Sequence, residues 1–218
     1  MSKIPIYLMP GLAASSTIFE RIVLPEADFE IFLLEWEIPI GNEKLVDYAK
    51  RMAKKVHHNQ AVLFGVSFGG ILVQEMAKFL DVKKVIIISS VKNCNEFPLK
   101  MKIAKSTKAY KLIPTALLVN VDGLAKFSFG DTITQRIKLY EKYLSMRDKH
   151  YLDWAIEQVV CWDCNETDKN VVQIHGDSDD VFPIKNITNA IVVKGGTHIM
   201  ILNKYKWFNE NLPKIIKS

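Results

Sequence analysis

Six short runs rich in Ile, Val, Leu and Phe constrain the fold more than any other feature of this sequence. They are Ile4–Met9, Ala27–Leu34, Ala61–Phe64, Lys84–Ser89, Val171–His175 and Ala190–Val193. Such runs are typical of strands that are buried on both faces. Between the early runs, apolar residues recur at helical spacing from Leu45 to Val56, behind a predicted N-cap at Asn42, and again from Leu72 to Leu80. Strands that alternate with helices predict an α/β fold with a parallel sheet and helices on both of its faces.

The alternation stops between Ser90 and Asn170, where the sequence contains no convincing strand. Two amphipathic helices are predicted there, one along Ile133, Ile137, Tyr140 and Leu144 and one along Tyr151, Trp154, Ala155 and Val159. We therefore expect a single domain over residues 1–218 with a helical insertion at about 91–168, after the fourth strand. This insertion would lie above the carboxyl ends of the strands, where open α/β sheets bind ligands.

The composition is that of a soluble globular domain, with 49% hydrophobic and 24% charged residues. The uncharged, mostly apolar stretch Ala61–Gln74 is shorter than the roughly 20 apolar residues of a membrane span. No signal-peptide core precedes Pro10 and Gly11, and three cysteines leave one unpaired, which fits a reducing compartment. We expect a cytoplasmic protein without stable membrane insertion.

The remaining polar patterns favour neither nucleic acid nor metal. The net charge is +5, and lysines cluster between residues 92 and 111, but no nucleic-acid motif accompanies them, so a solvated helix face is expected. Cys161 and Cys164 form a CxxC that follows a helical pattern, with no second pair spaced to complete a zinc site. We expect ordinary thiols and neither a metal nor a cofactor.

Residues 65–69 read Gly-Val-Ser-Phe-Gly and match the pattern GxSxG. The motif lies where the run Ala61–Phe64 ends and a helix is predicted to begin near Gly70. A serine on so sharp a strand-to-helix turn adopts an unusual backbone conformation, and the flanking glycines avoid collisions with the neighbouring elements. The turn exposes the Ser67 hydroxyl and directs the first helical amides toward it, so the Phe68 N–H is a candidate donor to an oxyanion.

A serine hydroxyl becomes a nucleophile only when a base removes its proton, so a histidine and an orienting carboxylate are required. Four of the five histidines have ordinary structural explanations, as helix caps, an insertion residue or the end of a strand: His57, His58, His150 and His175. His198 differs because it follows a Gly-Gly-Thr segment directly after the last predicted strand. That position places His198 at the same sheet edge as Ser67, and we predict that it is the base.

The carboxylate is expected in the loop after the preceding strand, where three acids compete: Asp177, Asp179 and Asp180. One would orient the imidazole of His198, while another would cap the loop or the next helix, which is a common role of Asp in turns. The residues alone leave this choice open. The chain order Ser, Asp, His is that of the α/β-hydrolase triad.

With these motifs, the sequence resembles a small α/β-hydrolase of the esterase type. The loops after the last two strands of that family typically read GxxD followed by Pro, and then GGxH. Residues 176–179 with Pro183 fit the first pattern, so the resemblance implies Asp179 as the triad acid, with Asp177 and Asp180 as alternatives. It further implies a six-stranded sheet with a helical cap, and a second oxyanion donor at the residue after Gly11, which is Leu12.

The expected cap would select the substrate. Four aromatic residues are candidates to line an apolar acyl pocket, although aromatic residues at helical spacing are also common in ordinary cores: Phe127, Phe129, Trp154 and Phe182.

Two functions follow from these expectations. The first is a cofactor-independent serine hydrolase that cleaves a small-molecule ester or thioester through an acyl-enzyme at Ser67. The second is a receptor or binding protein of the same fold that binds a small hydrophobic molecule with little turnover. Ligand-induced thermal stabilisation without hydrolysis across a panel of esters would distinguish the second from the first.

Overall fold

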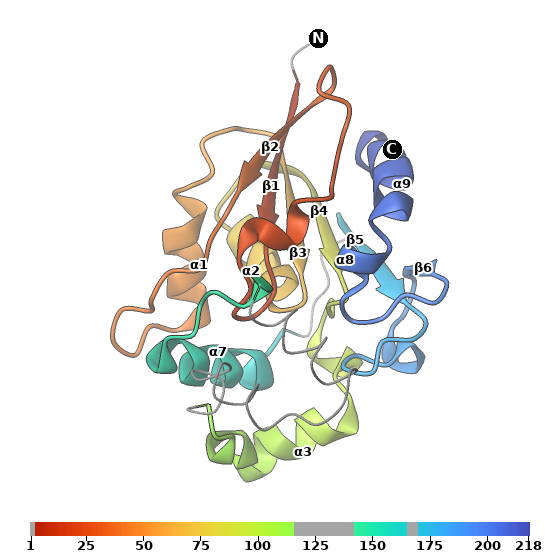
Figure 1. Ribbon diagram of the computed structural model, residues 1–218. Helices are drawn as coiled ribbons and strands as arrows, with labels where there is room; N and C mark the ends of the chain where they lie inside the picture. Colours follow the sequence, from red (N-terminus) through yellow and green to blue (C-terminus); the bar gives the residue numbers. More distant parts are fainter. Residues whose placement is uncertain (1–2, 116–141, 165–169) are drawn as a thin grey trace.

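The computed structural model describes residues 3–115, 142–164 and 170–218 (Figure 1). The strands are β1 (Ile4–Met9), β2 (Phe29–Leu33), β3 (Ala61–Val66), β4 (Val82–Ile88), β5 (Val171–Gly176) and β6 (Ile191–Val193). The α-helices described are α1 (Leu45–Ala53), α2 (Phe68–Ala77), α3 (Leu99–Thr107), α7 (Lys149–Cys161), α8 (Met200–Asn203) and α9 (Tyr205–Lys217). Short 3₁₀ helices are η1 (Ser16–Phe19), η2 (Cys94–Glu96), η3 (Ala109–Leu112) and η4 (Ile184–Asn186).

The strands form one six-stranded sheet in the order β2-β1-β3-β4-β5-β6. Every neighbouring pair is parallel, so the predicted parallel sheet is confirmed. The neighbouring strands β1 and β3 lead onward in opposite directions, β1 to β2 and β3 to β4. Such a reversal opens a crevice at the carboxyl ends of the two strands, which is where open α/β sheets bind ligands.

The buried parts of β1, β3 and β4 are apolar at successive positions because each side of the sheet is covered. Side chains alternate between the two faces of a strand, and the buried residues fall into two clusters that follow this alternation. One cluster takes Tyr7, Met9, Leu63, Val85 and Ile87. The other takes Ile6, Leu8, Val62, Phe64, Ile86 and Ile88. A continuous apolar run is therefore what a doubly covered strand requires.

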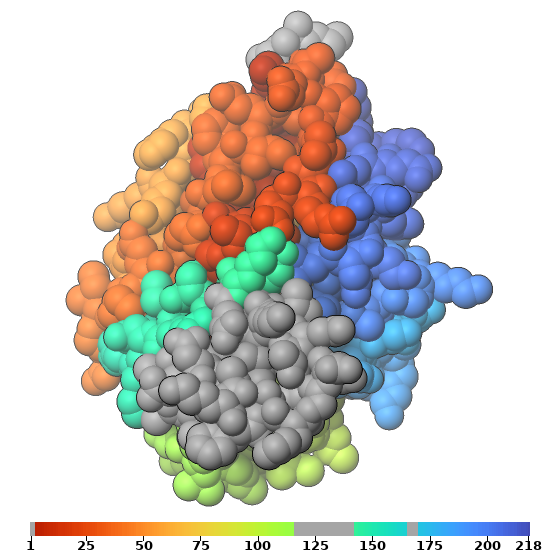
Figure 2. Space-filling model, viewed as in Figure 1, coloured from red at the N-terminus to blue at the C-terminus, as the bar shows by residue number. Residues whose placement is uncertain are grey.

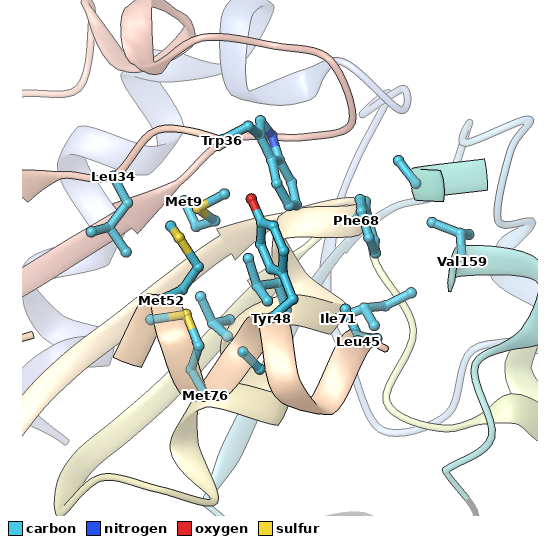
Figure 3. Packing of buried hydrophobic residues seen from close by; sticks show 14 of the residues in the cluster. Met9, Leu34, Trp36, Leu45, Tyr48, Met52, Phe68, Ile71, Met76 and Val159 are labelled. Atoms are coloured by element: carbon cyan, nitrogen blue, oxygen red, sulfur yellow. The ribbon is translucent and has the colours of Figure 1, made fainter. Parts of the chain in front are cut away.

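Different helices cover the two faces (Figure 1). Buried residues of α1, α2 and α7 belong to the first cluster, while those of η1, α8 and α9 belong to the second. Figure 3 shows side chains of α1, α2 and the segment after β2 meeting in the first cluster, with Tyr48, Trp36 and Phe68 close together. The rings of Trp36 and Phe68 stack with centroids 4.8 Å apart. This stack joins the segment after β2 to the start of α2.

Helix α1 begins later than predicted. Asn42 was expected to cap the helix, but the helix starts at Leu45, and the N-cap residue Lys44 makes no side-chain hydrogen bond to it. Instead the Leu45 N–H donates to Oε1 of Gln158 on α7, at 3.1 Å. A distant helix thus supplies the hydrogen bond that a local cap would have given.

Between β4 and β5 the described residues contain η2, α3, η3 and α7 but no strand. The predicted helix along Tyr151–Val159 is present as α7, and the Asp148 side chain caps it by accepting from the Tyr151 N–H at 2.9 Å. The other predicted helix, along Ile133, Ile137, Tyr140 and Leu144, lies outside the described residues except for Leu144. The treatment of 91–168 as a separate cap stays a prediction.

The segment before α7 lies against the loop that follows β1. The Ser15 N–H donates to the Tyr143 carbonyl at 2.9 Å, and the Met146 N–H donates to the Ala13 carbonyl at 3.1 Å. In Figure 2 this segment, in blue-green, lies directly beside the red-orange N-terminal region. The loop after β1 is therefore held on both sides, by the sheet and by residues from the middle of the chain.

Within the described residues, no helix has the length and apolar character needed to cross a membrane.

Candidate active site

Ser67 occupies the single residue between β3 and α2. Its backbone has φ +52° and ψ −119°, a conformation that costs a residue with a side chain on the order of 1–3 kcal/mol. Three contacts hold it there. The Ser67 N–H donates to the Ile88 carbonyl at 2.8 Å, and the Ser67 carbonyl accepts from the Gly70 N–H at 2.9 Å and from the Ser90 hydroxyl at 2.7 Å. The turn is therefore fixed by the neighbouring strand β4 and by the segment after it. Helix α2 starts at Phe68, two residues before the predicted start.

The two glycines of the GxSxG motif are required by close backbone approach. A Cβ atom on Gly65 would lie 2.3 Å from the Gly69 carbonyl oxygen, and one on Gly69 would lie 2.3 Å from the Pro10 carbonyl oxygen. Real Cβ atoms do not approach backbone this closely, because the atoms would overlap. The glycines thus let the start of α2 pack directly against the end of β1.

The loop after β1 lies beside the Ser67 side chain. A Cβ atom on Gly11 would be 3.6 Å from Cβ of Ser67, so Gly11, the residue before Leu12, lies beside Ser67. Nε1 of the buried Trp36 donates to the Gly11 carbonyl at 2.7 Å. In the described residues, neither the Leu12 nor the Phe68 amide donates a hydrogen bond to another atom of the chain. The assignment of these two amides as oxyanion donors stays a prediction.

His198 lies on the loop between β6 and α8 and contacts Ser67 directly. Nε2 of His198 is 2.9 Å from Oγ of Ser67, although the two residues are 131 positions apart. Nδ1 of His198 lies 3.0 Å from Oδ2 of Asp179 and 3.2 Å from Oδ1. A carboxylate can only accept, so this contact places the imidazole hydrogen on Nδ1 and leaves Nε2 able to accept from the serine hydroxyl.

The three competing acids have different surroundings. Asp179 is the acid that contacts His198, and its side chain is fully buried. Asp177 instead accepts at Oδ1 from the Gly195 N–H, at 2.7 Å, and from the Ser178 hydroxyl, at 3.0 Å. Asp177 thereby ties the loop after β5 to the loop that carries His198. Asp180 is exposed.

The loops after β5 and β6 meet backbone against backbone. A Cβ atom on Gly176 would lie 2.1 Å from the Gly196 carbonyl oxygen, and the Ser178 N–H donates to that oxygen at 2.9 Å. Gly195 has a φ of +63°, which is a conformation that glycine adopts without strain. These contacts set the distance between the acid and the imidazole.

The charge on Asp179 is stabilised inside the protein. Burial by itself raises the pKa of this carboxyl group, but the hydrogen bond and charge of His198, with further help from the Phe182 backbone N–H and His175, hold it below the ordinary value of 3.8. Oδ1 also accepts from the N–H groups of Val181, at 2.8 Å, and Phe182, at 2.9 Å. Asp179 is therefore ionised at neutral pH, as an orienting carboxylate must be.

The predicted pocket residues differ in their positions. Phe182 is buried, and its ring lies 5.6 Å from the imidazole of His198, edge to face. Trp154 packs against Tyr48 and Phe68 in the core, and its Nε1 donates to the Glu43 carbonyl at 2.6 Å. Phe127 and Phe129 lie outside the described residues. The role of these side chains in substrate binding stays a prediction.

The sequence did not identify two residues that hold the site. Trp36 fixes the Gly11 carbonyl, and Ser90 fixes the Ser67 carbonyl. Ser90 directly follows a predicted strand, so its position at the edge of the sheet could be inferred from the sequence. Its hydrogen bond to the Ser67 carbonyl could not. Trp36 gave no signal beyond that of an ordinary core aromatic residue.

Among the described residues, no group of three or more His, Cys, Asp or Glu side chains is placed to hold a metal ion.

Comparisons with known proteins bear on the fold. No protein-family model matches the sequence, and no curated protein matches it. A hydrolase from Pseudomonas aeruginosa PA01 is similar in structure, with a TM-score of 0.72 at 13% identity over 99% of this chain and 91% of that one. A bromoperoxidase from Bacillus anthracis has a TM-score of 0.67 at 18% identity, over 100% and 93% of the two chains. An esterase from Exiguobacterium antarcticum has a TM-score of 0.67 at 16% identity, again over 100% and 93%.

These matches cover 99–100% of this chain and agree with its six-stranded parallel sheet. This protein therefore has the α/β-hydrolase fold.

Proposed function

We propose that the protein is a serine hydrolase that cleaves a carboxylic ester or a thioester of a small molecule through an acyl-enzyme at Ser67. The observation that carries this proposal is the continuous contact from Oγ of Ser67 to Nε2 of His198, at 2.9 Å, and from Nδ1 of His198 to Asp179, at 3.0 Å. A base within hydrogen-bond reach of the hydroxyl, and oriented by a third group, is the arrangement that activates a serine.

In the first step, the hydroxyl oxygen of Ser67 bonds to the acyl carbon of the substrate while Nε2 of His198 accepts the hydroxyl proton. The resulting imidazolium donates to Asp179, whose buried negative charge stabilises it. Collapse of the tetrahedral intermediate breaks the bond to the alcohol or thiol, which leaves with the proton from His198. Ser67 then carries the acyl group as an ester.

The negative oxygen of the intermediate needs donors that are already in place. The amides of Leu12 and Phe68 are the candidates, because Leu12 follows Gly11 in the loop beside Ser67 and Phe68 is the first residue of α2. The N-terminus of a helix adds a favourable dipole for negative charge. Removing one such donor from an acyl-transfer site typically costs about 10²–10³-fold in rate, so both would contribute substantially.

In the second half of the reaction, water replaces the alcohol. His198 removes a proton from the water as it attacks the acyl carbon, and then returns that proton to Oγ of Ser67 as the carboxylic acid leaves. Every proton transfer in this scheme uses a residue of this chain. Two of the similar structures described above are named as a hydrolase and an esterase, which supports hydrolysis as the reaction class.

A fluorophosphonate probe followed by peptide mapping tests the proposal. It forms a stable bond to an activated serine, so we expect one adduct, at Ser67, with labelling abolished in Ser67→Ala and strongly slowed in His198→Ala. Ser178→Ala is the matched control, because this exposed serine lies on the neighbouring loop and contacts Asp177 rather than Ser67. Labelling elsewhere, or unchanged labelling of His198→Ala, would contradict the mechanism.

Substrate preference is then measured with p-nitrophenyl and coenzyme A esters of graded acyl length, with Ser67→Ala as the blank. We expect hydrolysis of at least one series, with kcat/KM that depends on acyl length. Specific labelling of Ser67 without hydrolysis of any ester or thioester would contradict the proposed substrate class while leaving the activated serine in place.

A further inference from the structure

A second histidine, besides His198, lies close to the Asp179 carboxylate. His175 is the penultimate residue of β5 and is completely buried. Its Nε2 atom is 2.8 Å from the Phe182 carbonyl oxygen and 3.5 Å from Oδ2 of Asp179. His175, near the end of β5, thus contacts Phe182 at the far end of the loop that follows this strand.

Phe182 connects this histidine to the triad through three of its own groups. Its carbonyl oxygen is held by His175, and its N–H donates to Oδ1 of Asp179 at 2.9 Å. Its ring packs edge to face on the imidazole of His198. A displacement of Phe182 would therefore move the acid and the base together.

The contacts define which ring nitrogen of His175 carries hydrogen. The Phe182 carbonyl can only accept, so Nε2 must be the donor. Nδ1 is buried and has no hydrogen-bond partner among the described residues. Burying an imidazole with one nitrogen unpaired costs free energy that an apolar side chain at the same position would not. The hydrogen bond from Nε2 to the Phe182 carbonyl is therefore the contact that accounts for a histidine at this position.

We propose that His175 is a positioning residue for the triad: its Nε2–H holds the Phe182 carbonyl and so fixes the loop that presents Asp179 to His198. This inference rests on the proposed function, because it assigns a role in that same reaction. His175 does not touch the reacting atoms, and it acts through Phe182 and Asp179. Its loss should affect the orientation of the imidazole more than the binding of the substrate.

Two substitutions separate the hydrogen bond from the space that the ring fills. In His175→Gln the side-chain amide places an N–H near the position of Nε2, whereas in His175→Asn the shorter amide places it near Nδ1, away from Phe182. We expect kcat to fall about 100-fold in the Asn variant, the size typical of a misplacement of about 1 Å, with KM unchanged. The Gln variant should keep most of the kcat.

The kcat values are expressed per folded protein, with thermal unfolding of both variants as the control for structural damage. Equal kcat in the Gln and Asn variants, whether both high or both low, would overturn the proposal. So would a loss that appears in KM rather than in kcat, because a positioning role predicts the reverse.

Nitrogen NMR of the unmodified protein gives an independent test that needs no activity. The expected His175 tautomer has hydrogen on Nε2 and a bare Nδ1, and hydrogen on Nδ1 alone would refute the contact on which the proposal depends. If the tautomer is as expected but Ser67 reacts with no fluorophosphonate, the proposed function fails and a role for His175 in it fails with it. If Ser67 reacts and the tautomer is wrong, only the role of His175 fails.

Discussion

Replacing Asp179 by asparagine would change little in shape but should reverse the hydrogen bond between this side chain and His198. Oδ1 of Asp179 accepts from two backbone N–H groups, those of Val181 at 2.8 Å and Phe182 at 2.9 Å. An asparagine at this position must keep its oxygen there, because an NH₂ group would face two donors. Its NH₂ group is then directed at Nδ1 of His198, which has to become an acceptor.

This change places the imidazole hydrogen on Nε2, facing the Ser67 hydroxyl, so His198 can no longer accept the proton. A base held in the wrong tautomer costs about 10⁴-fold in kcat, which corresponds to about 5.5 kcal/mol of transition-state stabilisation. We expect a loss of this size in Asp179→Asn, with little change in KM. The assay is steady-state hydrolysis of the best ester found, together with the rate of fluorophosphonate labelling of Ser67.

Asp177→Asn is the matched control. The Asp177 carboxylate uses Oδ1 to accept from Gly195 and Ser178, and the oxygen of an asparagine can keep both bonds. Its kcat should stay within about an order of magnitude of the unchanged protein, since no tautomer depends on it. A loss below tenfold in Asp179→Asn, or equal losses in the two variants, would refute the reasoning about the amide orientation.

Three further changes test other parts of the structure. Gly69→Ala places a Cβ atom 2.3 Å from the Pro10 carbonyl oxygen, so we expect a loss of about 3 kcal/mol or more in the free energy of urea unfolding; unchanged stability would disprove the close approach. Trp36→Phe removes the donor to the buried Gly11 carbonyl and should lower stability by about 1–3 kcal/mol and reduce kcat; full activity would mean that the loop needs no such support. The pKa of Asp179 is lowered in the folded state, because contacts led by the His198 hydrogen bond outweigh the effect of burial. Its stabilising contribution is therefore complete above the unfolded value of about 3.9 and is lost as the pH falls through the lower folded value. Urea unfolding from about pH 5 downward should show a steeper loss for the unchanged protein than for Asp179→Asn, and parallel curves would argue against this assignment.

Local sequence patterns determined the sheet and the position of Ser67. Strands covered on both faces must be apolar at successive positions, so β1, β3 and β4 were readable without knowing their neighbours. The GxSxG motif could be recognised for a similar reason. Its glycines are required by close backbone contacts, that of Gly65 with Gly69 and that of Gly69 with Pro10 at the end of the first strand. The order of the serine, acid and histidine loops followed from the order of the strands.

The residues alone left three acids open and the family resemblance implied Asp179, but only the tertiary structure shows which acid contacts the imidazole and which side chains hold the site. The three acids are close in sequence: Asp177, Asp179 and Asp180. The packing of their loop against Gly196 places Asp179 next to His198, while Asp177 accepts a hydrogen bond from the Gly195 backbone N–H. The same is true at the start of α1, where Gln158 replaces the expected cap at Asn42. Local patterns report on neighbours along the chain, whereas these contacts join residues that only the packing of the loops brings within hydrogen-bond distance.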